Sequence, residues 1–195
     1  EVIGGVAIPA LLLYMAPIFV MIRSFFFFHE KLNKQKILAL IMTIIGLCFI
    51  TGAFSQEVNL SGKAILLGLG AGFGYALYSI FSKMIIDKYE AVTIITYTFI
   101  VATIGSIPLS GVIYHVDELL SLQAIIAIIG LAIFCTVMPF LLYTTGLKKL
   151  EAGKASILAT IEPIVSAIVG LIFFQEVFDL TKILGMICII SAILI

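Results

Sequence analysis

The amino-acid sequence predicts an all-α membrane protein, a polytopic helical bundle with an inverted internal repeat. Three observations support this fold class: the hydropathy, a series of long apolar runs, and one segment that occurs twice. Hydrophobic residues make up 63% of the chain and charged residues 11%, and the mean hydropathy is +1.29. Because a soluble domain has roughly 45–50% apolar residues, this composition requires lipid as the surrounding solvent.

Apolar runs separated by short polar turns follow one another along the whole chain. The seven runs are residues 6–28, 37–54, 64–86, 92–114, 122–147, 155–174 and 183–195. Each of the first six is long enough to cross a ~30 Å hydrocarbon core at ~1.5 Å per residue. Short turns require neighbouring spans to be antiparallel. The chain lacks an initiator methionine and its last run stops at Ile195, so we expect a piece of a longer protein.

The repeated segment runs from Pro17 to Glu30 and again from Pro163 to Glu176, 146 positions later. In each copy an apolar run with an early proline ends in Phe-x-Glu, and a second apolar run follows. The copies lie in the first and sixth runs, five helices apart, and because this number is odd they lie in opposite orientations in the membrane. Inverted repeats of this kind are typical of secondary transporters.

The distribution of lysines predicts the orientation. Eight lysines lie in the turns around 29–36, 83–88 and 148–154, whereas the alternate turns hold two. Lys and Arg are enriched in cytoplasmic loops, so we expect 29–36 in the cytoplasm and 114–121 and 175–182 outside.

The third run combines a glycine face with a polar stripe. Gly68, Gly70, Gly72 and Gly74 form two overlapping Gly-x-x-x-Gly pairs, which predict close packing on another helix. Hydroxyl groups follow at helical spacing, and such a stripe should face protein or a wet cavity. The candidate cavity residues are Tyr75, Tyr78, Ser79, Ser82, Tyr97, Tyr143, Thr144 and Thr160. For each of them, structural hydrogen bonding is the alternative.

Two charges fall well inside apolar runs, Arg23 and Glu162. A lone charge in hydrocarbon costs at least ~2.5–3.5 kcal/mol, so each should find a partner or water. Arg23 either extends its long side chain to the interface or pairs. Glu162 either makes a structural hydrogen bond or faces a transport cavity, where it would pair with Arg23 or bind a cationic group or proton. Glu30 and Glu176 are expected to be solvated at the membrane interface.

Three prolines interrupt spanning helices: Pro17, Pro139 and Pro163. Each frees a backbone carbonyl, and irregular backbone at membrane depth persists where protein or cavity water satisfies it. A simple kink without a ligand is the alternative.

Other functional classes lack support in the sequence. Cys48, Cys135 and Cys188 all lie in apolar runs, where small buried hydrophobes are expected. No spacing indicates a metal site or another cofactor, and zero net charge gives no reason to expect nucleic acid. No catalytic motif is found, so an enzyme is not expected.

The duplicated pattern of Pro-Ile followed by Phe-x-Glu resembles the EamA domain of the drug/metabolite transporter superfamily. The run from Gly146 to Ser156, leading into Glu162 and Pro163, is also similar. The resemblance implies two inverted five-helix repeats and ten spans, with both termini cytoplasmic. Residues 1–54 would then hold the last two spans of the first repeat, and 62–195 the second repeat with its last span truncated.

The same resemblance implies a secondary transporter or exporter of small organic metabolites or drugs in a bacterial or archaeal cell membrane. Its partners would be a small-molecule substrate and the bilayer, and proton or ion coupling and a homodimer are left open. The spans holding Arg23, Tyr75, Tyr97, Tyr143 and Glu162 would line the cavity. Ala16 stands where the second copy has Glu162, so a carboxylate role does not transfer to both halves.

The alternative function is a seven-helix membrane receptor or photoreceptor, which only the number of spans suggests. Lys182 lies at the start of a run and not at mid-span, where a retinal Schiff base would form. The inverted repeat also counts against this alternative.

Overall fold

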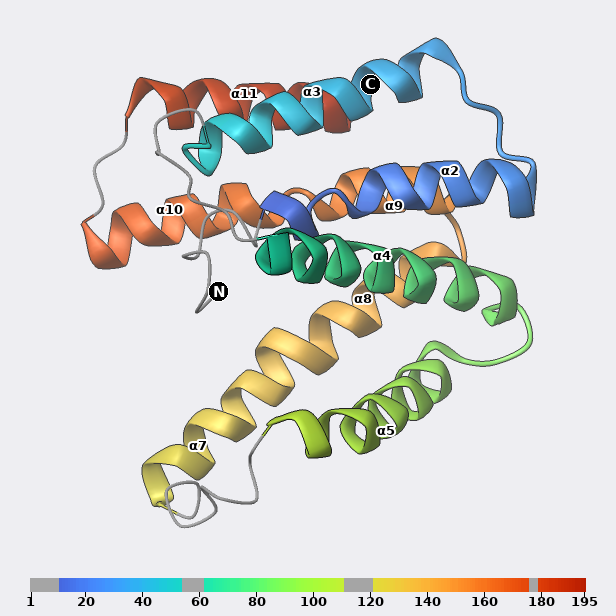
Figure 1. The fold of residues 1–195 in the computed structure, drawn as a ribbon, viewed down its shortest axis with the longest axis vertical. Coiled ribbons are helices and arrows are strands. Elements are labelled where there is room, and N and C mark those ends of the chain that lie inside the picture. Colours follow the sequence, from blue (N-terminus) through green and yellow to red (C-terminus); the bar gives the residue numbers. More distant parts are fainter. Residues whose placement is uncertain (1–10, 54–61, 111–120, 176–178) are drawn as a thin grey trace. The chain divides into compact units, whose positions relative to one another are not determined.

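The computed structural model describes residues 11–53, 62–110, 121–175 and 179–195, and these are helical almost throughout (Figure 1). The elements are α2 (Ala16–Phe28), α3 (Lys34–Ile50), α4 (Gly62–Ile85), α5 (Ala91–Ser110), α7 (Leu122–Gly130), the π-helix η2 (Leu131–Val137), α8 (Met138–Leu147), α9 (Ala152–Ala159), α10 (Glu162–Phe174) and α11 (Leu180–Leu194). The prediction of an all-α, multi-pass membrane protein is confirmed.

Five of the seven expected spans form helices that are long and apolar enough, within the described residues, to cross a membrane. They are Leu11–Phe28, Gly62–Ile85, Ala91–Pro108, Leu122–Leu147 and Ala152–Phe174. The other two expected spans, α3 and α11, have 17 and 15 helical residues. These two shorter helices pack against each other.

The chain divides into two compact units. The first comprises Glu1–Phe81 and Leu150–Ile195, and the second comprises Ser82–Lys149. The first unit therefore brings together segments from the beginning, middle and end of the chain, and the second is continuous in sequence.

In the first unit, α3 and α11 lie side by side and run in opposite directions, as do α2 and α9 (Figure 1). Two clusters of buried side chains join these layers. The buried members are Met21, Ala39, Ile157 and Ala192 in one cluster, and Leu47, Ile164 and Ile189 in the other. Each cluster combines residues from the beginning and from the end of the chain.

Two glycines bring α3 and α11 into backbone contact. A Cβ added to Gly46 would lie 2.7 Å from the Gly185 carbonyl oxygen, and a Cβ added to Gly185 would lie 2.6 Å from that of Gly46. Small residues permit such an approach between membrane helices. Any residue with a side chain at either position would push the two helices apart.

The repeated segment has the same local geometry in both copies. α2 ends at His29 (φ 53°, ψ 31°) and α10 ends at Gln175 (φ 52°, ψ 33°), both in the left-handed region. Four residues further on, Asn33 and Asp179 each accept a backbone N–H hydrogen bond at the start of the next helix. The 146-residue spacing found in the sequence therefore relates matching helix ends.

The glycine face of α4 packs on the chain just before α2. A Cβ at Gly68 would lie 2.7 Å from the side chain of Leu12, and a Cβ at Gly72 would lie 2.9 Å from the Leu12 carbonyl oxygen. Nothing in the described part of the chain lies within 4 Å of a Cβ at Gly70 or Gly74. Of the two glycine pairs expected to pack, Gly68 and Gly72 do so against the described residues, and Gly70 and Gly74 do not.

In the second unit, α5 packs against α8, with the Phe99 and Phe140 rings edge to face at 5.1 Å. The span from α7 to α8 contains the π-helix η2, which ends two residues before Pro139. Proline has no N–H to continue the preceding α-helical pattern, and π segments often occur at functional sites. The external turn expected at 114–121 lies almost wholly outside the described residues.

Candidate functional site

A break in the helix pair α9–α10 forms the centre of the candidate site. α9 ends at Ala159, a tight turn follows at Thr160 and Ile161, and α10 begins at Glu162. The Ile161 N–H donates to the Leu158 carbonyl at 3.2 Å, an i→i+3 bond in place of the helical i→i+4 bond. Pro163, at the second position of α10, cannot donate to the Ala159 carbonyl.

The chain before α2 contains the same break. Leu11–Leu13 are helical, a turn follows at Tyr14 and Met15, and Pro17 stands at the second position of α2. The Met15 N–H donates to the Leu12 carbonyl at 3.2 Å, the distance found between Ile161 and Leu158. Each of these residues precedes its counterpart by 146 positions, so the break is duplicated together with the sequence.

The two breaks face each other across a cavity of about 50 Å³ within the first unit. The residues that line it are Leu13, Tyr14, Ala16, Pro17, Tyr75, Ser156, Ala159, Thr160 and Glu162. Because proline has no N–H, Pro17 cannot donate a hydrogen bond to the Leu13 carbonyl, and Pro163 cannot donate one to the Ala159 carbonyl. In this conformation the cavity has room for water, and it is smaller than the ~300–1,000 Å³ of typical sites for organic ligands.

Glu162 lies at the edge of this cavity, and its side chain is exposed in the described part of the chain. The Tyr14 hydroxyl donates a hydrogen bond to the Glu162 carboxylate. A hydrogen bond to an ionised group is stronger than one between neutral groups. The only carboxylate of the cavity thus has a phenolic donor from the opposite break.

Arg23 has a different partner. Its guanidinium carbon lies 5.2 Å from the centre of the Phe73 ring, a cation–π contact between α2 and α4. Among the described residues, Arg23 and Glu162 form no ion pair within 4.0 Å. In this conformation the two intramembrane charges are stabilised separately.

The polar stripe of α4 divides into lining and packing residues. Tyr75 lines the cavity. The Tyr78 ring packs against the Tyr75 ring, with 6.5 Å between centroids. Ser79 is fully buried, and its hydroxyl donates to the Tyr75 carbonyl at 3.0 Å. Tyr75 is therefore the stripe residue that the structure brings to Glu162.

Tyr97 and Tyr143 belong to the second unit. Neither lines the cavity at Glu162 or the groove of the second unit, which is described next. Tyr97 is 67% exposed on α5, and Tyr143 is half-buried on α8. Thr144, on the same helix as Tyr143, is fully buried.

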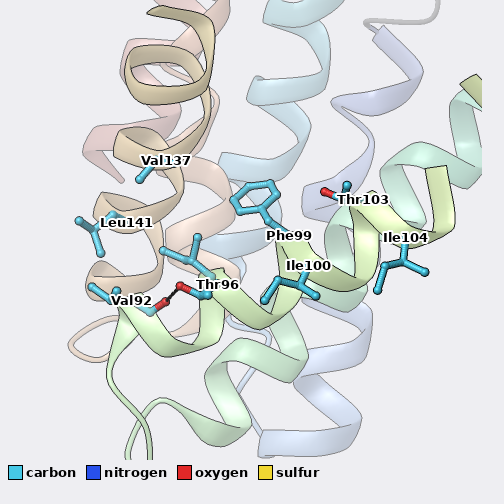
Figure 2. A pocket seen from close by; sticks show the side chains of 9 residues that line it. Val92, Thr96, Phe99, Ile100, Thr103, Ile104, Val137 and Leu141 are labelled. Carbon is cyan, nitrogen blue, oxygen red and sulfur yellow. Dashed lines mark hydrogen bonds between the residues drawn. The ribbon is translucent and has the colours of Figure 1, made fainter. Parts of the chain in front are cut away.

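The second unit has its own groove of about 480 Å³, lined by α5, η2 and α8 (Figure 2). Its walls are apolar except for two threonines, and the Thr96 hydroxyl is bonded to the Val92 carbonyl at 2.8 Å. Sequence reasoning missed this groove because its lining consists of ordinary membrane-helix residues with no distinguishing pattern.

Sequence reasoning also missed Tyr14 and Ser156 as cavity residues. A signal for Tyr14 was present, because the 146-residue offset aligns it with Thr160, which was a candidate. Ser156 lies one helical turn before Thr160, on the same side of α9. The 146-residue offset, applied to Thr160, identifies Tyr14.

Comparison with known proteins gives consistent results. The model of the EamA-like transporter family matches residues 2–52 and 62–195. An "Uncharacterized transporter" of Archaeoglobus fulgidus is 30% identical over 190 residues, which are 97% of this chain and 66% of the relative. "Uncharacterized transporter YetK" of Bacillus subtilis is 25% identical over 189 residues, 92% of this chain and 56% of the relative. The chain thus spans about two thirds or less of the length of these relatives.

One solved crystal structure superposes with a TM-score of 0.79 at 16% sequence identity, covering 96% of this chain and 64% of that chain. At this identity the likeness shows the fold alone.

Proposed function

Because the chain belongs to the EamA-like transporter family, we propose that the complete protein is a secondary transporter or exporter of small organic metabolites or drugs. The pair of matching helix breaks around one cavity that contains the Glu162 carboxylate is the observation that carries this proposal. Secondary transporters bind substrates and coupling ions near the bilayer midplane, at broken helices of inverted repeats. No observation on this chain favours the receptor alternative.

The proposed mechanism is alternating access. Irregular backbone at membrane depth is tolerated where it lines a cavity, and each break divides a spanning helix into two short pieces that can tilt separately. The first unit, with its small cavity, is then a closed conformation, which must widen before an organic solute can enter. Residues 1–54 are assigned to the first repeat and 62–195 to the second.

Glu162 is the proposed ligand for a cationic group or a proton. It is the one carboxylate among the residues that line the cavity, and Tyr14 and Tyr75 supply hydroxyl groups beside it. Neither Ser156 nor Thr160 competes as a donor, because their hydroxyls donate to the Gly153 and Ile157 carbonyls at 2.8 and 2.6 Å. A net negative site of this kind attracts a positive charge in a low-dielectric surrounding.

Transport by the complete protein in proteoliposomes tests this proposal. Organic cations, amino acids and sugars would be offered as substrates, with and without a pH gradient. Glu162→Gln should abolish transport of the accepted solute while leaving protein yield unchanged. Glu90→Gln, at an exposed residue before α5, is the matched control. Normal transport by Glu162→Gln at every pH would contradict the proposed role.

A further inference from the structure

Glu30 caps a helix that lies far from it in sequence. Its Oε1 accepts a hydrogen bond from the Ala152 N–H at 2.9 Å, and its Oε2 accepts one from the Gly153 N–H at 3.4 Å. These are the first two residues of α9, whose own N-cap residue, Glu151, makes no side-chain cap. A carboxylate at this place satisfies free N–H groups and is favoured by the helix dipole. The turn after α2 therefore supplies the N-terminal cap that α9 lacks.

Lys36 extends this contact into a cluster of three charges. Its Nζ lies 3.6 Å from Glu30 Oε2 and 2.9 Å from Glu151 Oε2. The Lys36 and Glu30 side chains are only 7% and 8% exposed. The expectation that Glu30 is solvated at the interface is therefore wrong, because the carboxylate has exchanged water for two amides and an ammonium. Its counterpart Glu176 lies outside the described residues.

The surrounding packing leaves little room at this junction. A Cβ at Gly153 would lie 3.3 Å from both the Met21 side chain and Glu30 Oε2. The start of α9 thus rests directly on the middle of α2, at Met21, and on the turn that follows α2. Any separation of these two helices must break both amide contacts and expose the Glu30 carboxylate, and leaving such buried partners unpaired is costly.

We propose that Glu30 is a positioning residue that holds this end of the transport cavity closed. α9 has eight residues; Ser156 lies within it and Thr160 directly follows it, and both line the cavity. Release of the Glu30 cap frees the start of α9 to move away from α2, and the broken turn at Thr160 acts as the hinge. Because Lys36 belongs to α3 and Glu151 precedes α9, the same movement separates the Lys36–Glu151 ion pair. This inference rests on the proposed transport cycle, but its test needs no substrate.

Thiol labelling of the complete protein tests the role of Glu30. Cys48, Cys135 and Cys188 are replaced by alanine, and Ala159→Cys supplies a single reporter in the cavity lining. An impermeant maleimide is then applied to intact cells and to inside-out vesicles. Glu30→Ala should raise labelling from the side of the 29–36 turn about tenfold, as expected for loss of hydrogen bonds to a charged group. Lys34→Ala, on the same turn, should leave the rate unchanged.

A second variant separates closing of the cavity from simple stabilisation of α9. Glu151→Asp gives α9 a local N-cap, so Glu30→Ala/Glu151→Asp should regain the melting temperature lost by Glu30→Ala. If Glu30 connects α9 to the α2–α3 turn, labelling stays high in this double variant. If labelling returns to the original rate together with the melting temperature, Glu30 is only a helix cap and the proposal is overturned.

Glu30→Gln extends the test to the case in which the alanine variant does not fold. It keeps the side-chain shape and one acceptor oxygen, and it removes the charge. Labelling should rise about two- to threefold, less than for alanine, since a neutral acceptor binds amides more weakly. An unchanged labelling rate in well-folded Glu30→Gln would contradict the proposal.

Discussion

His29 and Gln175 have nearly the same left-handed backbone conformation, and each donates its N–H to the carbonyl five residues earlier, of Ser24 and Gly170 respectively. Left-handed conformations are costly for residues with a Cβ. Neither position carries glycine, yet both residues have nearly the same φ and ψ. The duplicated Phe-x-Glu pattern thus corresponds to a defined helix end.

Glycine at these two positions should stabilise the protein. Gln175→Gly removes the steric strain of the left-handed residue at an exposed site, and the gain should exceed the extra chain entropy of glycine by about 0.5–1 kcal/mol. His29→Gly should behave alike. The melting temperature in detergent, followed by circular dichroism, measures the effect. Lys31→Gly, in the same turn but without a positive φ, should not stabilise, and equal stabilisation there would show that the left-handed geometry is not the cause.

Two glycines on α4 should respond oppositely to alanine. Gly72→Ala places a methyl group 2.9 Å from a backbone oxygen of Leu12, and the strain should lower stability by about 1–3 kcal/mol. Gly74→Ala meets nothing within 4 Å in the described part of the chain and should raise helix stability by up to about 1 kcal/mol. Thermal unfolding and the yield of monodisperse protein check both. Similar losses for the two would place the tight face of α4 elsewhere.

The hydrogen bond between Tyr14 and Glu162 should matter for transport. Tyr14→Phe removes the donor and keeps the ring, so it should reduce the transport rate by roughly 10- to 100-fold, the range for losing a hydrogen bond to a charged group. Protein yield should be unaffected. Tyr78→Phe, which changes a ring that does not line the cavity, should have the smaller effect. A larger loss for Tyr78→Phe would assign the cavity to the other side of the stripe.

The orientation of the chain is testable in intact cells. Single cysteines placed at Lys34 and Lys149 should be protected from an impermeant thiol reagent, whereas cysteines at Glu118 and Lys182 should react. The reason is the excess of lysines in the first set of turns. Permeabilised cells supply the control for reactivity. Reaction at Lys34 together with protection at Glu118 would reverse the assignment.

Much of the fold follows from the sequence because membrane helices are long and apolar. The number and places of the runs, the duplication and the prolines all depend on local pattern, and the structure places helix breaks where Pro17 and Pro163 predict irregular backbone. The left-handed helix ends could not be read from the sequence, because Gln has no preference for that conformation and His, although enriched there, adopts it in a minority of cases.

Contacts between residues that are far apart in the sequence were harder to predict. The Glu30 cap on α9 joins segments 122 residues apart, and nothing in either segment alone indicates the other. The sequence left open whether Arg23 and Glu162 would pair, because the position of a residue along its helix does not fix the direction in which its side chain points. Arg23 instead lies over Phe73, and Glu162 accepts from Tyr14.

The contact between α3 and α11 has a consequence for the origin of the chain. The 146-residue offset equates Gly46 with Ala192 and Ala39 with Gly185. Gly46 touches Gly185, and Ala39 shares a buried cluster with Ala192. In an isologous interface between two identical subunits, residue i of the first subunit contacts residue j of the second, and residue j of the first contacts residue i of the second. The two contacts between α3 and α11 follow this rule. Before fusion, a single half-sized chain inserted in both orientations could thus have dimerised through this face, and two small residues in one ancestral helix would have sufficed to specify it.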